Sequence, residues 1–120
     1  MKIGSFMLNL TSDDAARLKE FYRETVGLTP NPAYGEGAFD LTPGAVIAID
    51  GHSDTKGMAK EPQRALINFM VEDLKAEQSR LKAAGVQFIR EEGKEEWGGT
   101  ISTFLDPDGN YCQLVEFKGS

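Results

Sequence analysis

The chain has 120 residues, of which 40% are hydrophobic and 27% charged, so it is large enough to bury a core and too apolar for a disordered segment. Its formal net charge of −6 disfavours nucleic acid as a partner, because nucleic-acid binding needs a basic face, and favours a cationic ligand. The single cysteine excludes an intramolecular disulfide and a cysteine zinc cluster, and no apolar run approaches the ~18 residues of a membrane span, so we expect a cytoplasmic protein without membrane contact.

A strand and a helix open the chain. Apolar and polar residues alternate over residues 3–10, which predicts a strand with one face buried. Thr11 or Ser12 is expected to cap the helix that follows, because a hydroxyl can accept a hydrogen bond from the first turn. Apolar residues then recur at steps of three and four, and Gly27 is expected to end the helix.

A hairpin and a linker complete the first half. The stretch after the helix is rich in turn residues, including Pro30, and no strand is predicted there. Strands are expected at residues 38–41 and 46–50, joined by a turn at 42–44. Residues 51–63 are polar and carry no periodicity, which is typical of a linker.

The same plan restarts after the linker. In chain order we expect a strand, a helix, a second strand, a loop and a closing hairpin, at residues 64–71, about 73–84, 86–90, 91–99, and 100–105 with 111–117. Leu74, Leu81 and Ala84 are expected to face the sheet. Residues 106–110, Asp-Pro-Asp-Gly-Asn, are strong turn formers between the last two strands.

The two halves are related by an internal repeat. Residues 7–10 (MLNL) align with residues 66–69 (LINF), and the turn glycines Gly44 and Gly109 correspond. Each half alone would leave one face of its sheet uncovered, so the halves are expected to pack together. We therefore predict one α+β domain over residues 1–120, with module one at 1–50, the linker at 51–63 and module two at 64–118.

Three segments carry a resemblance to a known superfamily. Residues 21–28 (FYRETVGL) resemble the first helix of the vicinal-oxygen-chelate superfamily, which includes glyoxalases, bleomycin-resistance proteins, fosfomycin-resistance enzymes and extradiol dioxygenases. Residues 81–86 resemble its second helix, and residues 97–99 and 104–110 resemble its closing hairpin. The resemblance covers nearly the whole chain. It implies two βαβββ modules that form a cup-shaped mixed β-sheet with helices on its outer face, usually in a homodimer.

The resemblance also indicates where a metal would bind. In metal-dependent members, ligands project into the cup from the first and last strands of each module, and the matching positions here are Met7, Ala48, Leu66 and Gln113. A catalytic divalent ion needs about three carboxylate or imidazole ligands, and none of these residues supplies one. The only histidine, His52, falls in the predicted linker. We therefore predict no metal and no cofactor, as in the metal-free bleomycin-resistance-like branch.

Strand alternation predicts the lining of the cup instead. The loop residue Trp97 is added to this set. The expected ligand-binding residues are Met7, Asn9, Leu66, Asn68, Met70, Trp97, Thr103, Tyr111 and Gln113. Asn9 and Asn68 hold equivalent positions and are expected to face each other; they either bind ligand or only fix the core by hydrogen bonds to each other or to backbone. Trp97 either stacks on a flat ligand or anchors its loop to the sheet edge. Tyr34 is a candidate for the opposite rim.

These residues favour a binding protein over an enzyme. The leading hypothesis is metal-free sequestration of a small organic molecule, cationic or aromatic, of the bleomycin-resistance type. The alternative is a glyoxalase-, lyase- or isomerase-like enzyme with an unconventional site, but Thr103, Tyr111 and Gln113 are poor bases near neutral pH, and no catalytic residue is assigned. A third reading is a regulatory module whose dimer matters more than its pocket.

Overall fold

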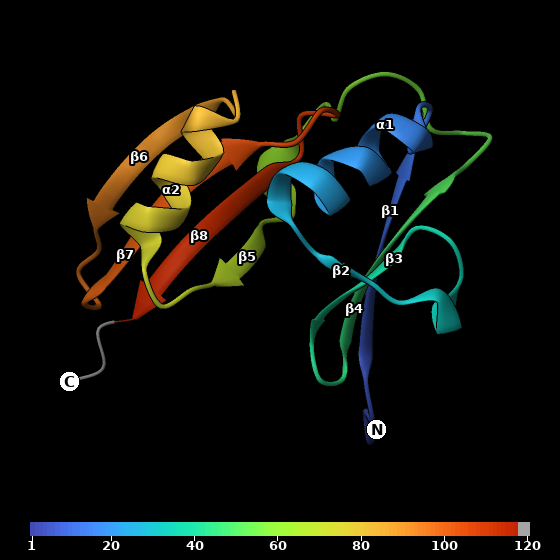
Figure 1. Cartoon of the computed structure of the whole chain (residues 1–120), viewed down its shortest axis with the longest axis horizontal. Coiled ribbons are helices and arrows are strands. Elements are labelled where there is room, and N and C mark those ends of the chain that lie inside the picture. Colours follow the sequence, from blue (N-terminus) through green and yellow to red (C-terminus); the bar gives the residue numbers. More distant parts are fainter. Residues whose placement is uncertain (118–120) are drawn as a thin grey trace. The chain divides into compact units, whose positions relative to one another are not determined.

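The computed structural model describes residues 1–117 and divides the chain into two compact units, Met1–Gly57 and Met58–Ser120. Each unit contains one four-stranded sheet and repeats the order strand, helix, three strands (Figure 1). Both sheets are mixed, since the first and last strands of each unit pair in parallel and the other pairs are antiparallel. The predicted α+β fold of two βαβββ modules is confirmed.

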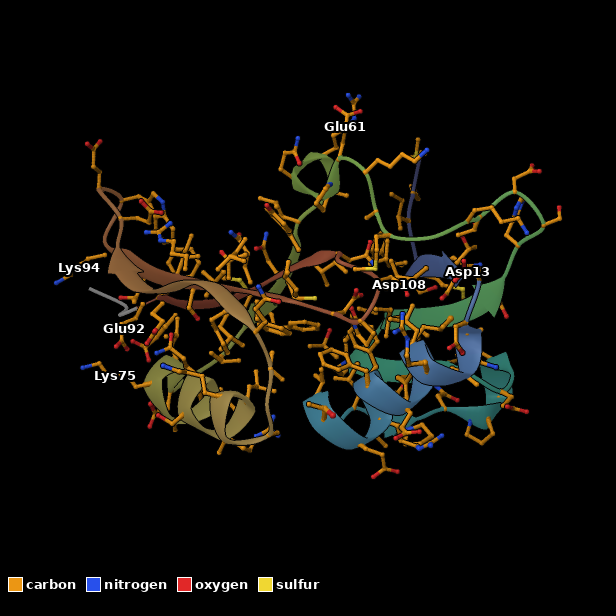
Figure 2. The ribbon with its side chains drawn as sticks, turned by 90° about the horizontal axis from the view of Figure 1, so that it is seen from above. Asp13, Glu61, Lys75, Glu92, Lys94 and Asp108 are labelled. Atoms are coloured by element: carbon orange, nitrogen blue, oxygen red, sulfur yellow. The ribbon has the colours of Figure 1, made fainter. Side chains whose placement is uncertain are left out.

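The first unit holds the sheet order β1-β4-β3-β2. Its elements are β1 (Phe6–Ser12), α1 (Ala15–Glu20), which continues as a π-helix (Phe21–Val26), β2 (Thr29–Pro30), a 3-10 turn (Pro32–Tyr34), β3 (Ala38–Thr42) and β4 (Ala45–Gly51). Leu18 and Tyr22 on the helix and Ile47 and Ile49 on β4 are completely buried. Alternation therefore assigns one face of this sheet to the helix, and Figure 2 shows the helix on one side of it.

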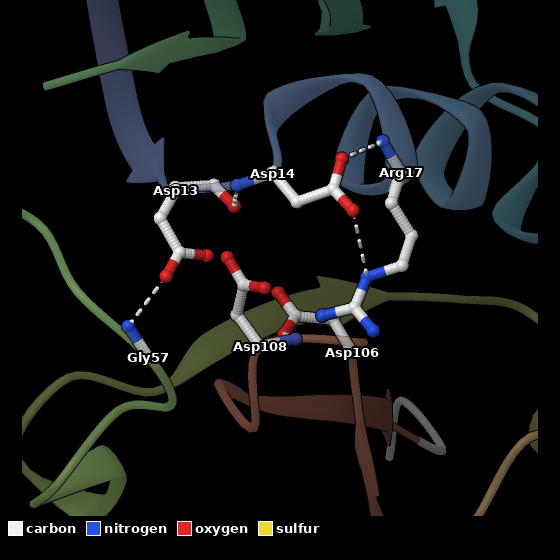
Figure 3. Close-up of polar contacts among 7 residues, drawn as sticks. Asp13, Asp14, Arg17, Gly57, Asp106 and Asp108 are labelled. Carbon is white, nitrogen blue, oxygen red and sulfur yellow. Dashed lines mark hydrogen bonds and ion pairs between the residues drawn. The ribbon is translucent and has the colours of Figure 1, made fainter.

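Three local expectations for the first unit were wrong. The first strand starts and ends later than residues 3–10, because its parallel partner β4 pairs with Phe6 through Ser12. Ser12 is therefore still in the strand, and the helix cap is Asp14, whose carboxylate accepts from the backbone N–H of Arg17 (Figure 3). The turn-rich stretch contains the short strand β2, in which Pro30 pairs with Phe39. Gly27 ends the helix as predicted, with a left-handed backbone.

Much of the predicted linker is attached to the first unit. The hydroxyls of Thr11 and Thr55 lie 2.7 Å apart, and the N–H of Gly57 donates to the carboxylate of Asp13 at 2.7 Å (Figure 3). The imidazole Nδ1 of His52 accepts from the N–H of Asp54 at 3.1 Å, which gives this histidine a local structural role.

The second unit holds the sheet order β5-β8-β7-β6. Its elements are a 3-10 turn (Pro62–Arg64), β5 (Ile67–Met70), α2 (Leu74–Ala83), β6 (Phe88–Lys94), β7 (Gly99–Leu105) and β8 (Tyr111–Phe117). Leu74 and Leu81 of α2 are 1% exposed and pack on the same side of the sheet as Phe104 and Cys112, which are fully buried. Cys112 is thus a core residue.

Side chains link α2 to its sheet. The N–H of Leu74 donates to the Glu116 carboxylate of β8 at 3.0 Å, so an acid from the sheet satisfies a free donor of the first helical turn. The amide oxygen of Gln78 accepts from the N–H of Glu92 on β6 at 3.0 Å. The register of β6 against β7 shifts near this point. The Gln78 side chain therefore accepts from a backbone N–H that the pairing of β6 with β7 does not use.

The second unit also corrects three expectations. Ala84 is exposed and lies after the helix, whereas the polar Gln78 is buried because it bonds to β6. β6 continues to Lys94, because it pairs with β7 through Lys94 and Thr100, so the predicted loop is only about half as long. β5 begins at Ile67, because its pairing with β8 starts there, and Leu66 lies outside the strand.

The closing hairpin is confirmed, and Asp106 organises its turn. This side chain is 4% exposed. One carboxylate oxygen accepts from the N–H groups of Asp108 at 2.9 Å and Asn110 at 3.0 Å, and the other accepts from the Asn110 side-chain amide at 2.8 Å.

In the described part of the chain, no helix combines the length and apolar character that crossing a membrane requires.

Candidate functional site

The face of the first sheet opposite α1, called here the first open face, carries a mixed set of side chains. Register places Met7, Val46 and Asp40 in one row across β1, β4 and β3. Residues in one row point to the same side of a sheet, and they alternate with the buried Ile47 of the helix-facing side. This row brings a thioether, an aliphatic group and a carboxylate together.

A pocket of ≈ 410 Å³ lies over this row, entirely within the first unit. That volume is within the range of small-molecule sites, about 300–1,000 Å³. Apolar groups make most of its wall, and the side chains that matter chemically are Met7, Asn31, Tyr34, Asp40 and Val46. Met7 is 44% exposed and Tyr34 58% exposed, so both offer surface to a ligand.

Asn31 holds the polar part of the pocket in place. Its side-chain amide donates to one carboxylate oxygen of Asp40 at 2.8 Å. Its own side-chain oxygen accepts from the N–H of Ala33 at 3.1 Å and caps the short 3-10 turn that presents Tyr34. One side chain therefore positions both the acid and the aromatic ring. The second oxygen of Asp40 has no hydrogen-bond partner among residues 1–117, which leaves it for a ligand donor.

The corresponding face of the second sheet carries a polar row next to an apolar one. Asn68, Gln113 and Thr103 lie side by side across β5, β8 and β7, and the Gln113 amide donates to the Thr103 hydroxyl at 3.1 Å. The neighbouring row contains Met70 and Val115. Thr103 is only 4% exposed, whereas Met70 is 58% exposed.

Trp97 lies at the end of this second face. A methyl group added at Gly99 would overlap the Trp97 ring, so the indole lies directly over the Gly99 backbone. The same ring packs on Phe117 with 4.8 Å between centroids. These contacts give Trp97 a structural anchor at the sheet edge, while 51% of the residue remains exposed for other contacts.

The predicted site residues therefore divide between the two units. Met7 and Asn9 lie on the first open face, and Met7 lines the pocket together with Tyr34. Asn68, Met70, Thr103, Tyr111 and Gln113 share the open face of the second sheet. The approach of Asn9 to Asn68 across the two units stays a prediction.

Among the pocket residues that were missed at the sequence level, Asn31 and Asp40 carry its polar chemistry. The signal for Asp40 was present, since Ala38-Phe39-Asp40-Leu41 alternates and a buried Phe39 puts Asp40 on the opposite face. Asn31 had no comparable signal. Its role depends on the short strand β2, which was not predicted, and on the 3-10 turn at Pro32, which lies in the stretch expected to be rich in turns but whose form was not specified.

The residues at the expected metal positions do not fit a divalent ion. Met7 and Ala48 lie on the first open face and offer no oxygen or imidazole donor. Leu66 is apolar, and Gln113, whose amide nitrogen donates to Thr103, could offer only one neutral amide oxygen. Across residues 1–117, no three or more His, Cys, Asp or Glu side chains cluster closely enough to hold a metal.

Comparisons with known proteins agree with this architecture. A family model described as Glyoxalase/Bleomycin resistance protein/Dioxygenase superfamily matches residues 2–114. The uncharacterized protein YetH of Bacillus subtilis (strain 168) is 30% identical over 109 residues, which cover 87% of this chain and 90% of that protein.

Solved structures show the same fold. A glyoxalase/bleomycin resistance protein from Catenulispora acidiphila superposes with a TM-score of 0.68 at 24% identity, covering 93% of this chain and 96% of that one. TnmS3, an antibiotic-binding protein from Streptomyces sp. CB03234, superposes with a TM-score of 0.70 at 22% identity, covering 95% of each chain.

Proposed function

Because the chain belongs to the glyoxalase/bleomycin resistance/dioxygenase superfamily, we propose that it is a metal-free protein that binds and sequesters a small, flat, cationic organic molecule, with the first open face as part of its site. The proposal includes a cytoplasmic homodimer as the working form. The antibiotic-binding description of the structural neighbour TnmS3 supports the ligand type.

The pocket over Met7 and Asp40 carries this proposal. Tyr34 provides an aromatic surface for a flat ligand, and Met7 provides an unbranched side chain that adapts to irregular shapes. Asp40 provides a negative charge whose position Asn31 fixes in advance, which lowers the ordering cost of binding. The overall charge of −6 adds a general attraction for cations.

The alternative in the same superfamily is a metal-free enzyme. Among the residues that line the pocket, Asp40 is the one acid, so a proton-transfer step in this pocket would depend on it. No nucleophile is paired with it there, since Asn31 is its hydrogen-bond partner. The binding function therefore uses all of the observed features and the enzymatic one does not.

The test is a binding screen by native mass spectrometry, followed by titration calorimetry. The panel contains cationic aromatic antibiotics and DNA-intercalating dyes, each with a neutral analogue of similar shape. A cationic ligand should bind, and Asp40→Asn should weaken it about fivefold, the size expected for an exposed charge pair. The side-chain oxygen that this substitution retains would still accept from the Asn31 amide, so the shape of the pocket is kept. The affinity of the neutral analogue should not change.

Two controls separate the parts of the proposal. Tyr34→Ala should weaken both the cationic and the neutral ligand, since it removes shared apolar contact. Dialysis against a chelator should leave binding unchanged. If binding vanishes without divalent ions, or if Asp40→Asn binds the cation as tightly as the native chain, the proposed mode of recognition is wrong. Conversion of a bound ligand, seen as a mass change in the same spectra, would support the enzyme instead.

A further inference from the structure

The first unit contains a second pocket, which shares no residue with the first. It has a volume of ≈ 280 Å³ and lies between the helical segment and the loop before β3. Pro30, Pro32 and Phe39 form an apolar wall, and Lys19 and Arg23 place two cationic groups at it. Its size is at the lower end of the range for small-molecule sites, which suits a fragment-sized ligand.

Gly37 has no side chain, and this leaves the space at the pocket that Lys19 occupies. A Cβ atom at Gly37 would lie 2.6 Å from the Lys19 Cε atom and 3.2 Å from its Cδ atom. Gly37 also has a φ of +91°, a conformation that L side chains rarely adopt. The glycine therefore provides a cradle for the Lys19 stem, and only 21% of the Lys19 side chain is exposed.

The charge of Lys19 is weakly compensated. Its ammonium lies 3.6 Å from a carboxylate oxygen of Glu36, whose side chain is 92% exposed. An exposed and flexible carboxylate at this distance contributes little. An ammonium on a largely buried side chain with such a partner can gain from a better placed anion, since charge-assisted hydrogen bonds are short and strong.

Arg23 adds a second cationic group, one helical turn after Lys19. Its Nε donates to Glu24 at 3.0 Å, and 47% of the side chain is exposed. A guanidinium carries five N–H donors in a planar fork, so the bond through Nε leaves the terminal nitrogens able to reach a ligand. Lys19 and Arg23 together match the planar oxygens of a carboxylate.

We propose that this pocket is a second binding site that takes a small organic anion, an aromatic carboxylate being the class that fits. The carboxylate binds Lys19 and the terminal nitrogens of Arg23, and it displaces Glu36. The ring packs against the two prolines. The site prefers an anion, whereas the first pocket is proposed to bind a cation. The two proposals are independent, because the pockets share no residue.

The experiment is an NMR titration of the uniformly ¹⁵N-labelled full chain at low salt, with benzoate, phenyl phosphate, benzamide and benzylamine as probes. Benzoate should give saturable amide shifts at residues 35–39 and at Lys19 and Arg23. Neutral benzamide should bind about tenfold or more weakly, the difference expected for a charge-assisted hydrogen bond. Phenyl phosphate tests whether a tetrahedral anion is accepted as well, and binding tighter than that of benzoate would overturn the carboxylate preference.

Matched variants decide the roles of the residues. Lys19→Met keeps the stem against Gly37 and should weaken benzoate at least tenfold, whereas Lys75→Met, the same change on the exposed face of α2, should not. Glu36→Gln removes the competing carboxylate and should tighten benzoate binding severalfold. If the spectrum shows that Lys19→Met is unfolded, Arg23→Gln takes its place with the same expected loss. Equal binding of benzoate and benzamide, or unchanged benzoate binding in these variants, would overturn the proposal.

Discussion

Replacement of Ser102 by alanine should stabilise the protein. Ser102 is completely buried on β7, facing α2, and its hydroxyl oxygen has no hydrogen-bond partner among residues 1–117. A buried and unsatisfied polar group costs about 1–3 kcal/mol relative to solvation in the unfolded chain. Ser102→Ala removes that group and leaves only a small void. We therefore expect the free energy of unfolding to rise by about 1 kcal/mol.

Ser12 provides the matched control, because the same substitution there should act in the opposite direction. Its hydroxyl is 2% exposed and accepts from the N–H of Asp14 at 3.0 Å. Ser12→Ala leaves that donor without its partner and should lower the free energy of unfolding by about 1 kcal/mol. Both variants have the same composition, so general effects of alanine cancel in the comparison.

Chemical and thermal unfolding followed by circular dichroism measure both effects. For a chain of this length, 1 kcal/mol corresponds to a change in Tm of about 4 °C, so the two variants should differ by about 8 °C. An unchanged m-value would show that the denatured state is not altered. If Ser102→Ala loses stability as Ser12→Ala does, the Ser102 hydroxyl has a partner in solution and the reasoning is refuted.

Two further substitutions test other parts of the second unit. Asp106→Ala removes three accepted hydrogen bonds from the closing turn and should lower the free energy of unfolding by about 3 kcal/mol, while Asn110→Ala, which removes only the side-chain donor, should cost about 1 kcal/mol in the same denaturation assay; equal losses would contradict the assigned network. Gly99→Ala should displace the Trp97 ring and shift its fluorescence to longer wavelength, whereas Gly4→Ala, which meets nothing within 4 Å, should leave the spectrum unchanged. An unshifted spectrum in Gly99→Ala would contradict the position of the indole.

Elements with a strong local pattern were predictable from sequence. The closing hairpin was located within a residue because Asp106 and Asn110 determine the turn locally. The helix in the second unit was located equally well, since Asp73 caps it and Leu74 and Leu81 are buried. In these places, local chemistry and tertiary packing favour the same structure.

Elements that depend on pairing were less predictable. The length of β6 follows from its antiparallel partner, because its own residues 90–92 are charged and resemble a loop. β2 is defined by pairing with β3 across only two residues, one of them Pro30. The buried Gln78 was missed for the same reason, since its partner is a backbone N–H on another element. Each of these features depends on a tertiary contact that local propensity does not encode.

The pocket and the unsuitable metal positions have one structural cause on the first open face. Met7 on β1 and Ala48 on β4 take the places where the family resemblance implies ion ligands; Met7 is an exposed apolar group and Ala48 is buried. Asp40, in the same row as Met7, is the acid of this surface, and Asn31 occupies one of its two carboxylate oxygens. A single carboxylate beside a thioether cannot supply about three hard donors, whereas it can pair with one cationic group on an organic molecule. The same residues that make an ion site unsuitable are therefore the ones on which the proposed binding of an organic cation rests.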